Sequence, residues 1–388
     1  MRNKIAKALG IVFKPSQSDA LDLYESLPSP KRVCYYHPPG EGKTFTALAS
    51  LALEGAKEAV IITPPTTTPQ WQADADKLGI SVTIMSHAKF RMKPTKLSRH
   101  VPIVIDEFHM LGGNGKQGWS KLDGMAPHVQ ASIIVMSATP SYNDAERVYC
   151  VQHVLAPDTV RGGFPAFLYA NCILEPAFKG LPKVVGFHKY RDAEEFLASL
   201  PYVAYVPDTA VYEIEDTRFP TVLPDAWWDY GWDARAQSIM RSLMGRRISY
   251  YRHQMLADDG TLRDEVAHWA YEVIAHSDTP VLVYCDHSTI AEAAAKDLGG
   301  DIITGRTSKK QRDLKLADFK AGKIPVLVAT ATITTGTDGL DKVCNTLILL
   351  QDTPDDSLRR QIVGRILPRG TDTNYEDKRI VRALYGEP

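Results

Sequence analysis

From about residue 30 onward, short runs of apolar residues alternate with longer stretches in which apolar residues recur at helical spacing. The short runs are typical of buried parallel strands, and the longer amphipathic stretches are typical of the helices that connect them. The first series predicts strands at 33–37, 58–63, 81–85, 102–106 and 132–139, with helices at 43–56 and 69–79. This order of elements predicts an open α/β sheet with parallel strands.

A second series of the same kind begins near residue 262. It predicts strands at 281–285, 301–305, 326–330 and 346–350, and helices at 262–276, 289–299, 309–322 and 356–367. Between the two series the pattern breaks up, and proline and aromatic residues become frequent. We therefore expect two α/β lobes in tandem, at 1–155 and 261–388, joined by a mostly helical insertion or bridge at 156–260.

Composition and charge narrow the class of protein. The chain has 388 residues, of which 44% are hydrophobic, and its 45 Lys and Arg against 46 Asp and Glu give a net charge of −1. A polyanion would therefore be met by local basic patches, since the chain has no strong overall field. The five cysteines are far apart and form no C-x-x-C pair, which predicts neither a disulfide framework nor a zinc ribbon. We expect a protein of the reducing cytoplasm, without a signal peptide or membrane span.

The strongest local motif is HPPGEGKT at 37–44, placed between a predicted strand and a predicted helix. It matches the P-loop pattern at Gly42, Lys43 and Thr44, although His37 stands where the first glycine is usual. Glycines such as Gly40 let backbone amides close around phosphate oxygens, the lysine reaches the β- and γ-phosphates, and the threonine can ligate Mg²⁺. A glycine turn that merely precedes Lys-Thr is the alternative, which the flanking strand and helix disfavour.

Two adjacent carboxylates follow the predicted strand at 102–106, within the sequence VPIVIDEFH. They lie at the carboxyl edge of the sheet, where ligands bind in open α/β folds. Asp106 is expected to hold Mg²⁺, Glu107 to polarise the attacking water, and His109 to connect this site to its surroundings. Taken alone, the pair is more often an ordinary helix start stabilised by the helix dipole. The P-loop in the same lobe favours the catalytic interpretation.

The motifs HPPGEGKT, DEFH and SATP (137–140), in this order on successive strand ends, resemble motifs I, II and III of superfamily 2 helicases and translocases of the DExH type. The resemblance implies two RecA-like P-loop lobes and Mg²⁺-dependent ATP hydrolysis. It implies that Ser137 and Thr139 couple the nucleotide state to nucleic-acid binding. It also implies that Glu41 lies in the ATP-binding loop and that Gln17 contacts adenine. The alternative for Gln17 is a plain surface residue on an N-terminal helix. The segments 63–71 and 85–90 resemble the strand-contacting motifs Ia and Ib.

The second lobe resembles the helicases in motif VI, which begins with QIVGR at 361–365. In this family, motif VI supplies arginines that neutralise the charge developing on the γ-phosphate. The resemblance therefore implies catalytic roles for Gln361 and Arg365, with Arg365 as the arginine finger. The chain departs from the family at the second arginine position, which is Pro368, and Arg369 follows one place later. This departure leaves open whether Arg369 is catalytic or a surface residue beside a turn.

Residues 329–341 resemble motif V, in which Gly336 and Asp338 match the core of the pattern. Asp338 is expected to sense the nucleotide, and Asp341 is an alternative because GTDGLD offers both acids. The spacing after motif III and the DGLD element resemble the Swi/Snf-type translocases, particularly short phage or bacterial members. The P-loop and SATP sequences are closer to viral RNA helicases and restriction-type motors. A bacterial cell or a phage-infected host is the implied location.

Three stretches concentrate positive charge, at 89–100, 241–253 and 305–315. Contact with a phosphate backbone requires sequence-independent charge of this kind, although a solvated helix face is as good an explanation for any one stretch. The candidate nucleic-acid contacts are Lys89, Arg91, Lys93, Arg246, Arg247, Lys309 and Lys310. The aromatic cluster at 227–232 could stack on bases, but packing is the more common role of such a cluster.

Together these features predict a nucleic-acid-stimulated ATPase that acts as a DNA helicase or as a translocase and remodeller on duplex or branched DNA. Single-stranded DNA is a further substrate to consider. Two alternatives are a DExH RNA helicase and an ATP-switched nucleic-acid-binding module with little turnover. We expect ATP and Mg²⁺ as cofactors, a monomer, and no membrane partner.

Overall fold

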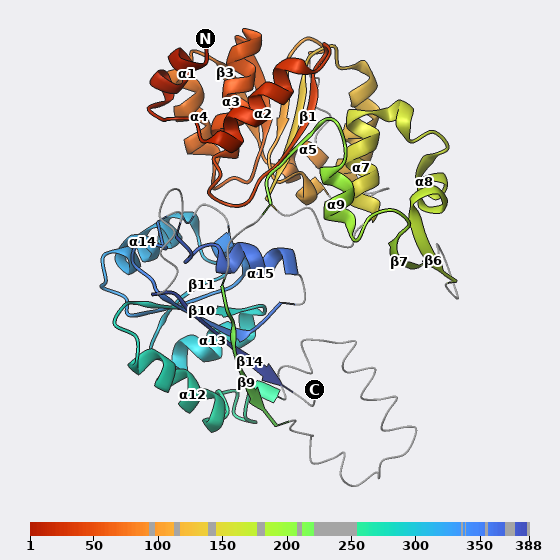
Figure 1. The fold of residues 1–388 in the computed structure, drawn as a ribbon. Coiled ribbons are helices and arrows are strands. Elements are labelled where there is room, and N and C mark those ends of the chain that lie inside the picture. The colour runs from red at the N-terminus through yellow and green to blue at the C-terminus, as the bar shows by residue number, and fades with distance from the viewer. Residues whose placement is uncertain are drawn as a thin grey trace. The chain divides into compact units, whose positions relative to one another are not determined.

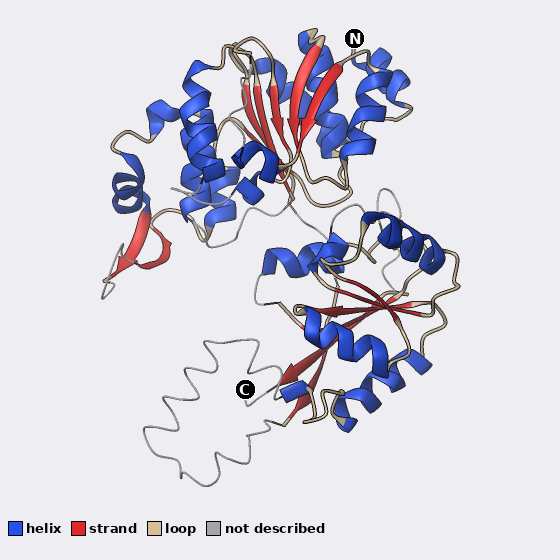
Figure 2. Cartoon of the chain, turned by 180° about the vertical axis from the view of Figure 1, so that it is seen from behind, coloured by secondary structure: helices blue, strands red, loops and turns tan. Residues whose placement is uncertain are grey.

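The computed structural model describes residues 1–92, 98–111, 117–138, 145–176, 183–207, 212–220, 254–334, 337, 339–353, 356–368 and 377–385. The chain forms two compact units, Met1–Thr209 and Ala210–Pro388. Each unit is built around a parallel sheet with helices on its faces (Figures 1 and 2). No helix among these residues is long and apolar enough to cross a membrane.

The first unit contains a six-stranded sheet of order β3-β2-β4-β5-β1-β8, in which every strand pair is parallel. Its strands are β1 (Arg32–Tyr36), β2 (Glu58–Ile62), β3 (Ser81–Met85), β4 (Ile103–Ile105), β5 (Ile133–Ser137) and β8 (Val203–Tyr205). Its α-helices are α1 (Arg2–Leu9), α2 (Pro15–Ser26), α3 (Lys43–Glu54), α4 (Thr68–Lys77), α5 (His87–Met92), α6 (Gln117–Met125), α7 (Ala145–Leu155), α8 (Gly163–Asn171) and α9 (Ala193–Ala198). Short 3₁₀ turns lie at Phe108–Leu111, Ala126–His128 and Pro157–Thr159.

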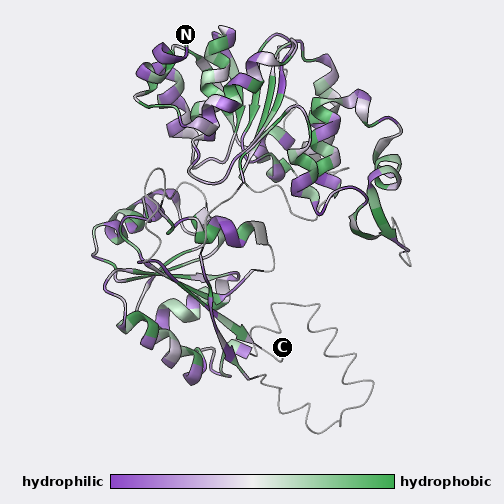
Figure 3. Cartoon of the chain, in the orientation of Figure 1, coloured by the Kyte–Doolittle hydropathy of each residue, from purple (hydrophilic) through white to green (hydrophobic). Residues whose placement is uncertain are grey.

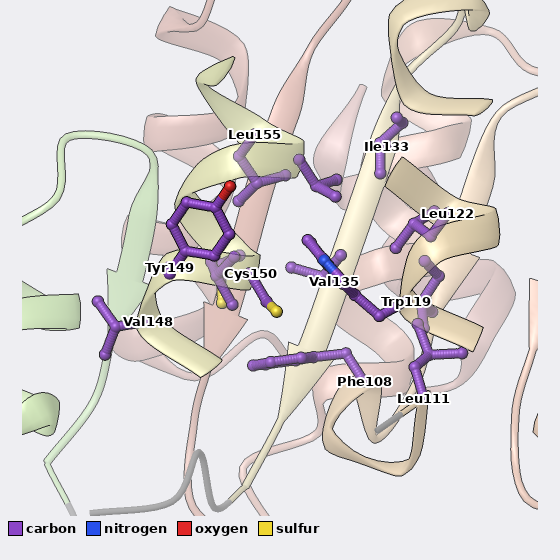
Figure 4. Close-up of a cluster of buried hydrophobic side chains, with 14 of the residues drawn as sticks. Phe108, Leu111, Trp119, Leu122, Ile133, Val135, Val148, Tyr149, Cys150 and Leu155 are labelled. Carbon is purple, nitrogen blue, oxygen red and sulfur yellow. The ribbon is translucent and has the colours of Figure 1, made fainter. Parts of the chain in front are cut away.

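Both faces of the central strands β1, β2, β4 and β5 are buried, which explains why these strands are nearly continuous apolar runs (Figure 3). Successive side chains of a strand point to opposite faces. On β1, Val33 and Tyr35 pack in one cluster with helices α2, α3 and α4, and Cys34 and Tyr36 pack in the other. The second cluster also holds Phe108, which directly follows the two carboxylates of the DEFH sequence (Figure 4).

The structure differs from the expected helical insertion at 156–260. The described residues up to 207 belong to the first unit, where β8 extends the sheet beside β1 and an antiparallel hairpin forms from β6 (Cys172–Glu175) and β7 (Lys183–Phe187). The reason is that the aromatic residues of this segment, such as Phe167 and Phe196, pack in the core of the first unit together with Tyr149 of α7. The predicted aromatic cluster at 227–232 and basic stretch at 241–253 lie outside the described residues.

The second unit contains a six-stranded sheet of order β11-β12-β10-β13-β14-β9, also with parallel pairs throughout. Its strands are β9 (Glu215–Phe219), β10 (Val281–Cys285), β11 (Asp301–Ile303), β12 (Val326–Ala329), β13 (Thr346–Gln351) and β14 (Arg379–Tyr385). Its α-helices are α12 (Asp264–Ala275), α13 (Ser288–Asp297), α14 (Lys309–Lys320) and α15 (Asp356–Val363), with a 3₁₀ turn at Ala331–Thr334. One face of this sheet packs against α12 and α13, and the other against α14 and α15.

The parallel topology positions the candidate site of the first unit. Strands β1, β4 and β5 lie beside one another, and their carboxyl ends therefore meet at one edge of the sheet. The HPPGEGKT loop follows β1, the DEFH sequence follows β4, and Ser137 is the last residue of β5. The sequence predicted this arrangement from the order of motifs and strands.

Candidate functional site

The HPPGEGKT loop turns sharply into helix α3. Gly40 and Gly42 have φ values of 82° and 72°, the left-handed region that glycine adopts without strain. Gly42 caps the amino end of α3, so the loop and the first turn of the helix direct backbone amides to the same place. The side chain of Lys43 folds back over the loop, where its Nζ donates to the carbonyl of His37 at 2.8 Å and of Pro38 at 3.2 Å. The positive end of α3 and a lysine ammonium thus meet at one loop.

Gln17 is not a surface residue, because only 3% of it is exposed. Its Nε2 donates to the carbonyl of Gly42 at 3.1 Å, and its Oε1 accepts from the backbone amide of Lys14 at 2.9 Å. A Cβ atom at position 42 would lie 2.6 Å from Gln17 Nε2. An alanine at position 42 would therefore be strained by its φ value and would also force this glutamine to shift.

Glu41 is held at the tip of the loop by α2 and the residue before it. Lys14 Nζ donates to Glu41 Oε1 at 2.8 Å, and Ser16 Oγ donates to Glu41 Oε2 at 2.8 Å. Burial alone would raise the pKa of Glu41, but the hydrogen bonds from these two residues outweigh burial and lower the pKa below its usual value. Glu41 is thus ionised and fixed, and it ties the loop to α2.

Asp106 follows β4 and is 7% exposed. Its Oδ2 accepts from Thr63 Oγ1 at 3.0 Å and from Trp71 Nε1 at 3.3 Å. Burial raises the pKa of Asp106, and so does the neighbouring Glu107, whereas Lys43 opposes them. A buried carboxylate whose charge is poorly compensated by the protein is suited to a cation. The contacts from Thr63 and Trp71 were not expected from the sequence, because they join residues far apart in the chain.

Glu107, His109 and Ser137 form a polar triangle at the ends of β4 and β5. Ser137 Oγ donates to Glu107 Oε2 at 3.3 Å, and His109 Nδ1 lies 3.0 Å from the same hydroxyl and 3.4 Å from Glu107 Oε2. Glu107 has a φ of 48° and is the one non-glycine residue with positive φ in the described part of the chain. Strain of this kind concentrates at functional sites. The structure therefore brings together three of the predicted residues, while Thr139 lies outside the described residues.

His37 is a feature of the loop to which the sequence assigned no chemistry. Its ring is fully buried, and neither nitrogen has a hydrogen-bond partner among the described residues. Burial, together with the positive charge of Lys43, lowers the pKa of His37 to about 4. A second histidine, His87, has its Nε2 2.8 Å from the carbonyl of Asp106, and burial lowers its pKa to about 4 as well. Both rings are therefore neutral at pH 7.

In the second unit, Arg365 lies two residues after the end of helix α15, and its Nη2 donates to the carbonyl of Thr334. Gln361 is half-buried on α15. Asp341, the alternative acid of motif V, accepts from Lys378 Nζ through its backbone carbonyl at 2.6 Å. The remaining candidates in this unit, Gly336, Asp338 and Arg369, lie outside the described residues.

The candidate nucleic-acid contacts that the structure describes are all exposed. Lys89 and Arg91 lie on α5, where Arg91 Nη1 donates to the carbonyl of Met110 at 2.9 Å. Lys309 and Lys310 open helix α14 of the second unit. The other three candidates, Lys93, Arg246 and Arg247, lie outside the described residues.

The site contains few ready-made metal ligands. Within the described residues, no three or more His, Cys, Asp or Glu side chains are grouped to hold a metal ion. Asp106 and the Thr44 hydroxyl would therefore share a cation with water and phosphate oxygens, which is the usual coordination of Mg²⁺. This donor set fits Mg²⁺ bound together with a nucleotide.

Comparison with known proteins gives an independent view of the chain. Residues 265–369 match the helicase conserved C-terminal domain. The Rad25 homologue of Halobacterium salinarum, named as a DNA 3'-5' helicase, is 20% identical over 347 residues, which are 87% of this chain and 48% of that protein. The chain thus spans about half the length of this curated relative.

Two solved structures align with most of this chain. Saccharomyces cerevisiae Dbp5 bound to RNA and ADP BeF3 aligns with a TM-score of 0.53 at 16% identity, covering 98% of this chain and 86% of that chain. The Sulfolobus solfataricus SWI2/SNF2 ATPase core in complex with dsDNA aligns with a TM-score of 0.42 at 15% identity, covering 96% and 88%. The likeness to Dbp5 and the two parallel sheets confirm the predicted tandem RecA-like lobes. The domain match at 265–369 lies within the second of these lobes.

Proposed function

We propose that the chain is a nucleic-acid-stimulated ATPase that acts as a DNA helicase or as a translocase on duplex or branched DNA. The observation that carries this proposal is the polar triangle of Glu107, His109 and Ser137 beside the HPPGEGKT loop, in a chain whose residues 265–369 match a helicase domain. The relative named as a DNA helicase favours DNA over RNA. The spacing after motif III and the DGLD element further favour the Swi/Snf-type branch.

Mg²⁺-ATP fits the residues at this edge of the first unit. The loop offers the amino end of α3 and the ammonium of Lys43, which together form an anion site, and Asp106 offers a buried carboxylate for the cation. When bound, the nucleotide supplies the phosphoanhydride bond that water cleaves. We assign Lys43 to neutralising the phosphates, and Thr44 with Asp106 to holding the metal. Gln17 is assigned to the adenine, next to the loop it already contacts.

We assign the proton transfer of hydrolysis to this triangle, together with the coupling of hydrolysis to nucleic-acid binding. Glu107 is the general base that accepts a proton from the attacking water, and its Oε2 is oriented by the Ser137 hydroxyl. His109 contacts the same hydroxyl, so a change at the end of β5 alters the position of the base. Arg365 is our choice of arginine finger, because an arginine at the γ-phosphate stabilises the charge of the transition state. Gln361 of α15 is assigned a catalytic role as well.

Exposed basic residues are assigned to the phosphate backbone. Lys89 and Arg91 of the first unit and Lys309 and Lys310 of the second can contact phosphates without selecting a base sequence. A motor that moves along DNA requires contacts of this kind. Lys93, Arg246 and Arg247 are assigned to the same role from the sequence alone.

The proposal is tested by steady-state ATP hydrolysis with no polynucleotide, single-stranded DNA, duplex DNA, a four-way DNA junction, and RNA. We expect duplex or branched DNA to stimulate turnover, and Lys43→Ala to abolish it. Lys57→Ala, at an exposed lysine outside the site, is the matched control that should keep full activity. Stimulation by RNA alone would replace the proposal with an RNA helicase. Negligible turnover with every polynucleotide would contradict hydrolysis and favour an ATP-switched binding module.

A further inference from the structure

Four alternating charges connect strand β9 to helix α15 within the second unit. Asp216 on β9 accepts from Arg382 of β14 through Nε at 2.8 Å and Nη2 at 2.9 Å. Arg382 also donates through Nη1 to Asp352 Oδ2 at 3.3 Å, and the same oxygen accepts from Nε of Arg359 on α15 at 2.7 Å. Arg359 further donates to the carbonyl of Thr353 at 2.6 Å. We name Asp216, Arg382, Asp352 and Arg359 the β9–α15 relay.

The relay differs from an ordinary pair of surface charges, which contributes little to a fold. The side chains of Asp352, Arg359 and Arg382 are only 12%, 19% and 21% exposed. Arg382 donates to Asp216 through two nitrogens, a geometry that fixes the orientation of the two side chains as well as their distance. The hydrogen bonds from Arg382 also lower the pKa of Asp216, so the outer member of the relay remains ionised at neutral pH. The relay can therefore hold α15 at a defined place.

The residues that precede β9 and the end of α15 take part in one apolar cluster. Tyr212 and Ile214, which lead into β9, pack against the cluster that contains Ile362, Val363 and Ile366 at the end of α15. The residues before β9 and the helix α15 therefore share one apolar cluster, and the relay links β9 to α15 as well. This segment is the first described part of the second unit, directly after the chain leaves the first unit at Thr209.

We propose that the β9–α15 relay positions helix α15. The four residues of the relay are therefore positioning residues for Gln361 and Arg365. This inference rests on the proposed function, in which those two residues act on the nucleotide. Because of the relay, the position of α15 depends on β9, the first strand after the boundary between the two units. Loss of Arg382 removes both the contact to β9 and one of the two cations on Asp352.

A matched control lies on the same pair of strands. Arg379 of β14 donates to Glu215 of β9 through Nε at 3.0 Å and Nη2 at 3.0 Å, and it has no hydrogen bond or ion pair to α15 among the described residues. Arg379→Gln and Arg382→Gln therefore remove the same charge and the same kind of β9–β14 pair. The two variants differ in the link to Asp352 and Arg359, and in exposure, because the side chain of Arg379 is 42% exposed and that of Arg382 is 21% exposed.

The first readout is the split between kcat and KM in DNA-stimulated ATP hydrolysis. We expect Arg382→Gln to lower kcat by roughly 10- to 100-fold with little change in KM for ATP, because a small misplacement of a catalytic group has this effect. Arg379→Gln should change kcat by less than about twofold, as an exposed ion pair contributes little. Arg382→Lys should restore part of the activity through its charge, but not all, because lysine lacks the fork. Equal loss in the two glutamine variants, or full activity of Arg382→Gln, would overturn the inference.

The second readout needs no hydrolysis. Amide hydrogen exchange of the full chain should become faster across α15 in Arg382→Gln and in Asp352→Asn, and remain unchanged there in Arg379→Gln. If the wild-type chain hydrolyses no ATP, the proposed function fails, and exchange at α15 still decides whether the relay holds the helix. Unchanged exchange of α15 in both relay variants would overturn the inference.

Discussion

Replacing Gly42 with alanine tests how tightly the HPPGEGKT loop is constrained. The φ of 72° at Gly42 is left-handed, and an L-residue there is strained by about 1–2 kcal/mol. A Cβ atom would also lie 2.6 Å from Gln17 Nε2, so the glutamine has to move. Gln17 is 3% exposed and makes two hydrogen bonds, to Gly42 and Lys14, each worth about 1 kcal/mol. We therefore expect Gly42→Ala to lower the free energy of unfolding by about 3–4 kcal/mol.

Gly55 provides the control, because it caps the other end of α3. Its φ is 79°, but a Cβ there would meet nothing within 4 Å. Gly55→Ala should therefore show the left-handed strain alone, about 1–2 kcal/mol. In the Gln17→Ala background the clash is gone, and Gly42→Ala should also fall to about 1–2 kcal/mol. Urea titrations of the four variants measure these differences. Equal destabilisation by Gly42→Ala and Gly55→Ala in the wild-type background would refute the packing argument.

Three further predictions concern the polar groups of the first unit. The pKa of His37 is lowered from 6.5 to about 4, so the unfolded chain binds the proton first and stability should fall by up to about 3 kcal/mol between pH 6.5 and 4. His37→Gln should reduce this slope in urea titrations and leave the part that His87 contributes, and an unchanged slope would contradict it. Ser137→Ala should reduce DNA stimulation of ATP hydrolysis by about tenfold, because the hydroxyl contacts both His109 and Glu107. Full stimulation of this variant would show that these contacts do not contribute to the response to DNA. Trp71→Phe should lower the free energy of unfolding by about 1–2 kcal/mol, because the variant lacks the donor to Asp106 and leaves a small cavity. An unchanged free energy of unfolding in urea titrations would contradict a stabilising contact between Trp71 and Asp106.

Local motifs made much of the first unit predictable. The HPPGEGKT and DEFH sequences each lie directly after an apolar run, so their strand ends followed from the order of residues. The parallel sheet then placed Glu107, His109 and Ser137 together. By contrast, the contact of Trp71 with Asp106 depends on how α4 packs, and no local pattern reports it.

The strands not predicted from the sequence lie at or next to a sheet edge, and include β8, β9 and β14. Strand β9 has the sequence EDTRF and is mostly exposed, so it lacks the apolar run that marked the central strands. Its pairing with β14 is supported by ion pairs of Glu215 and Asp216 with Arg379 and Arg382. Charges of this kind are indistinguishable in the sequence from a solvated loop. This limit explains why β9 was included in the expected helical insertion. Strand β8, also included there, is apolar but only three residues long.

The central claim is that Glu107 is the base for ATP hydrolysis at the end of β4. The most direct measurement compares Glu107→Gln with the wild-type chain for nucleotide binding and for single-turnover ATP hydrolysis in the presence of duplex DNA. Because glutamine keeps the size of the side chain and removes its basicity, we predict that nucleotide binding is retained and that hydrolysis falls by about 10²- to 10⁴-fold. Full hydrolysis by Glu107→Gln would contradict the account.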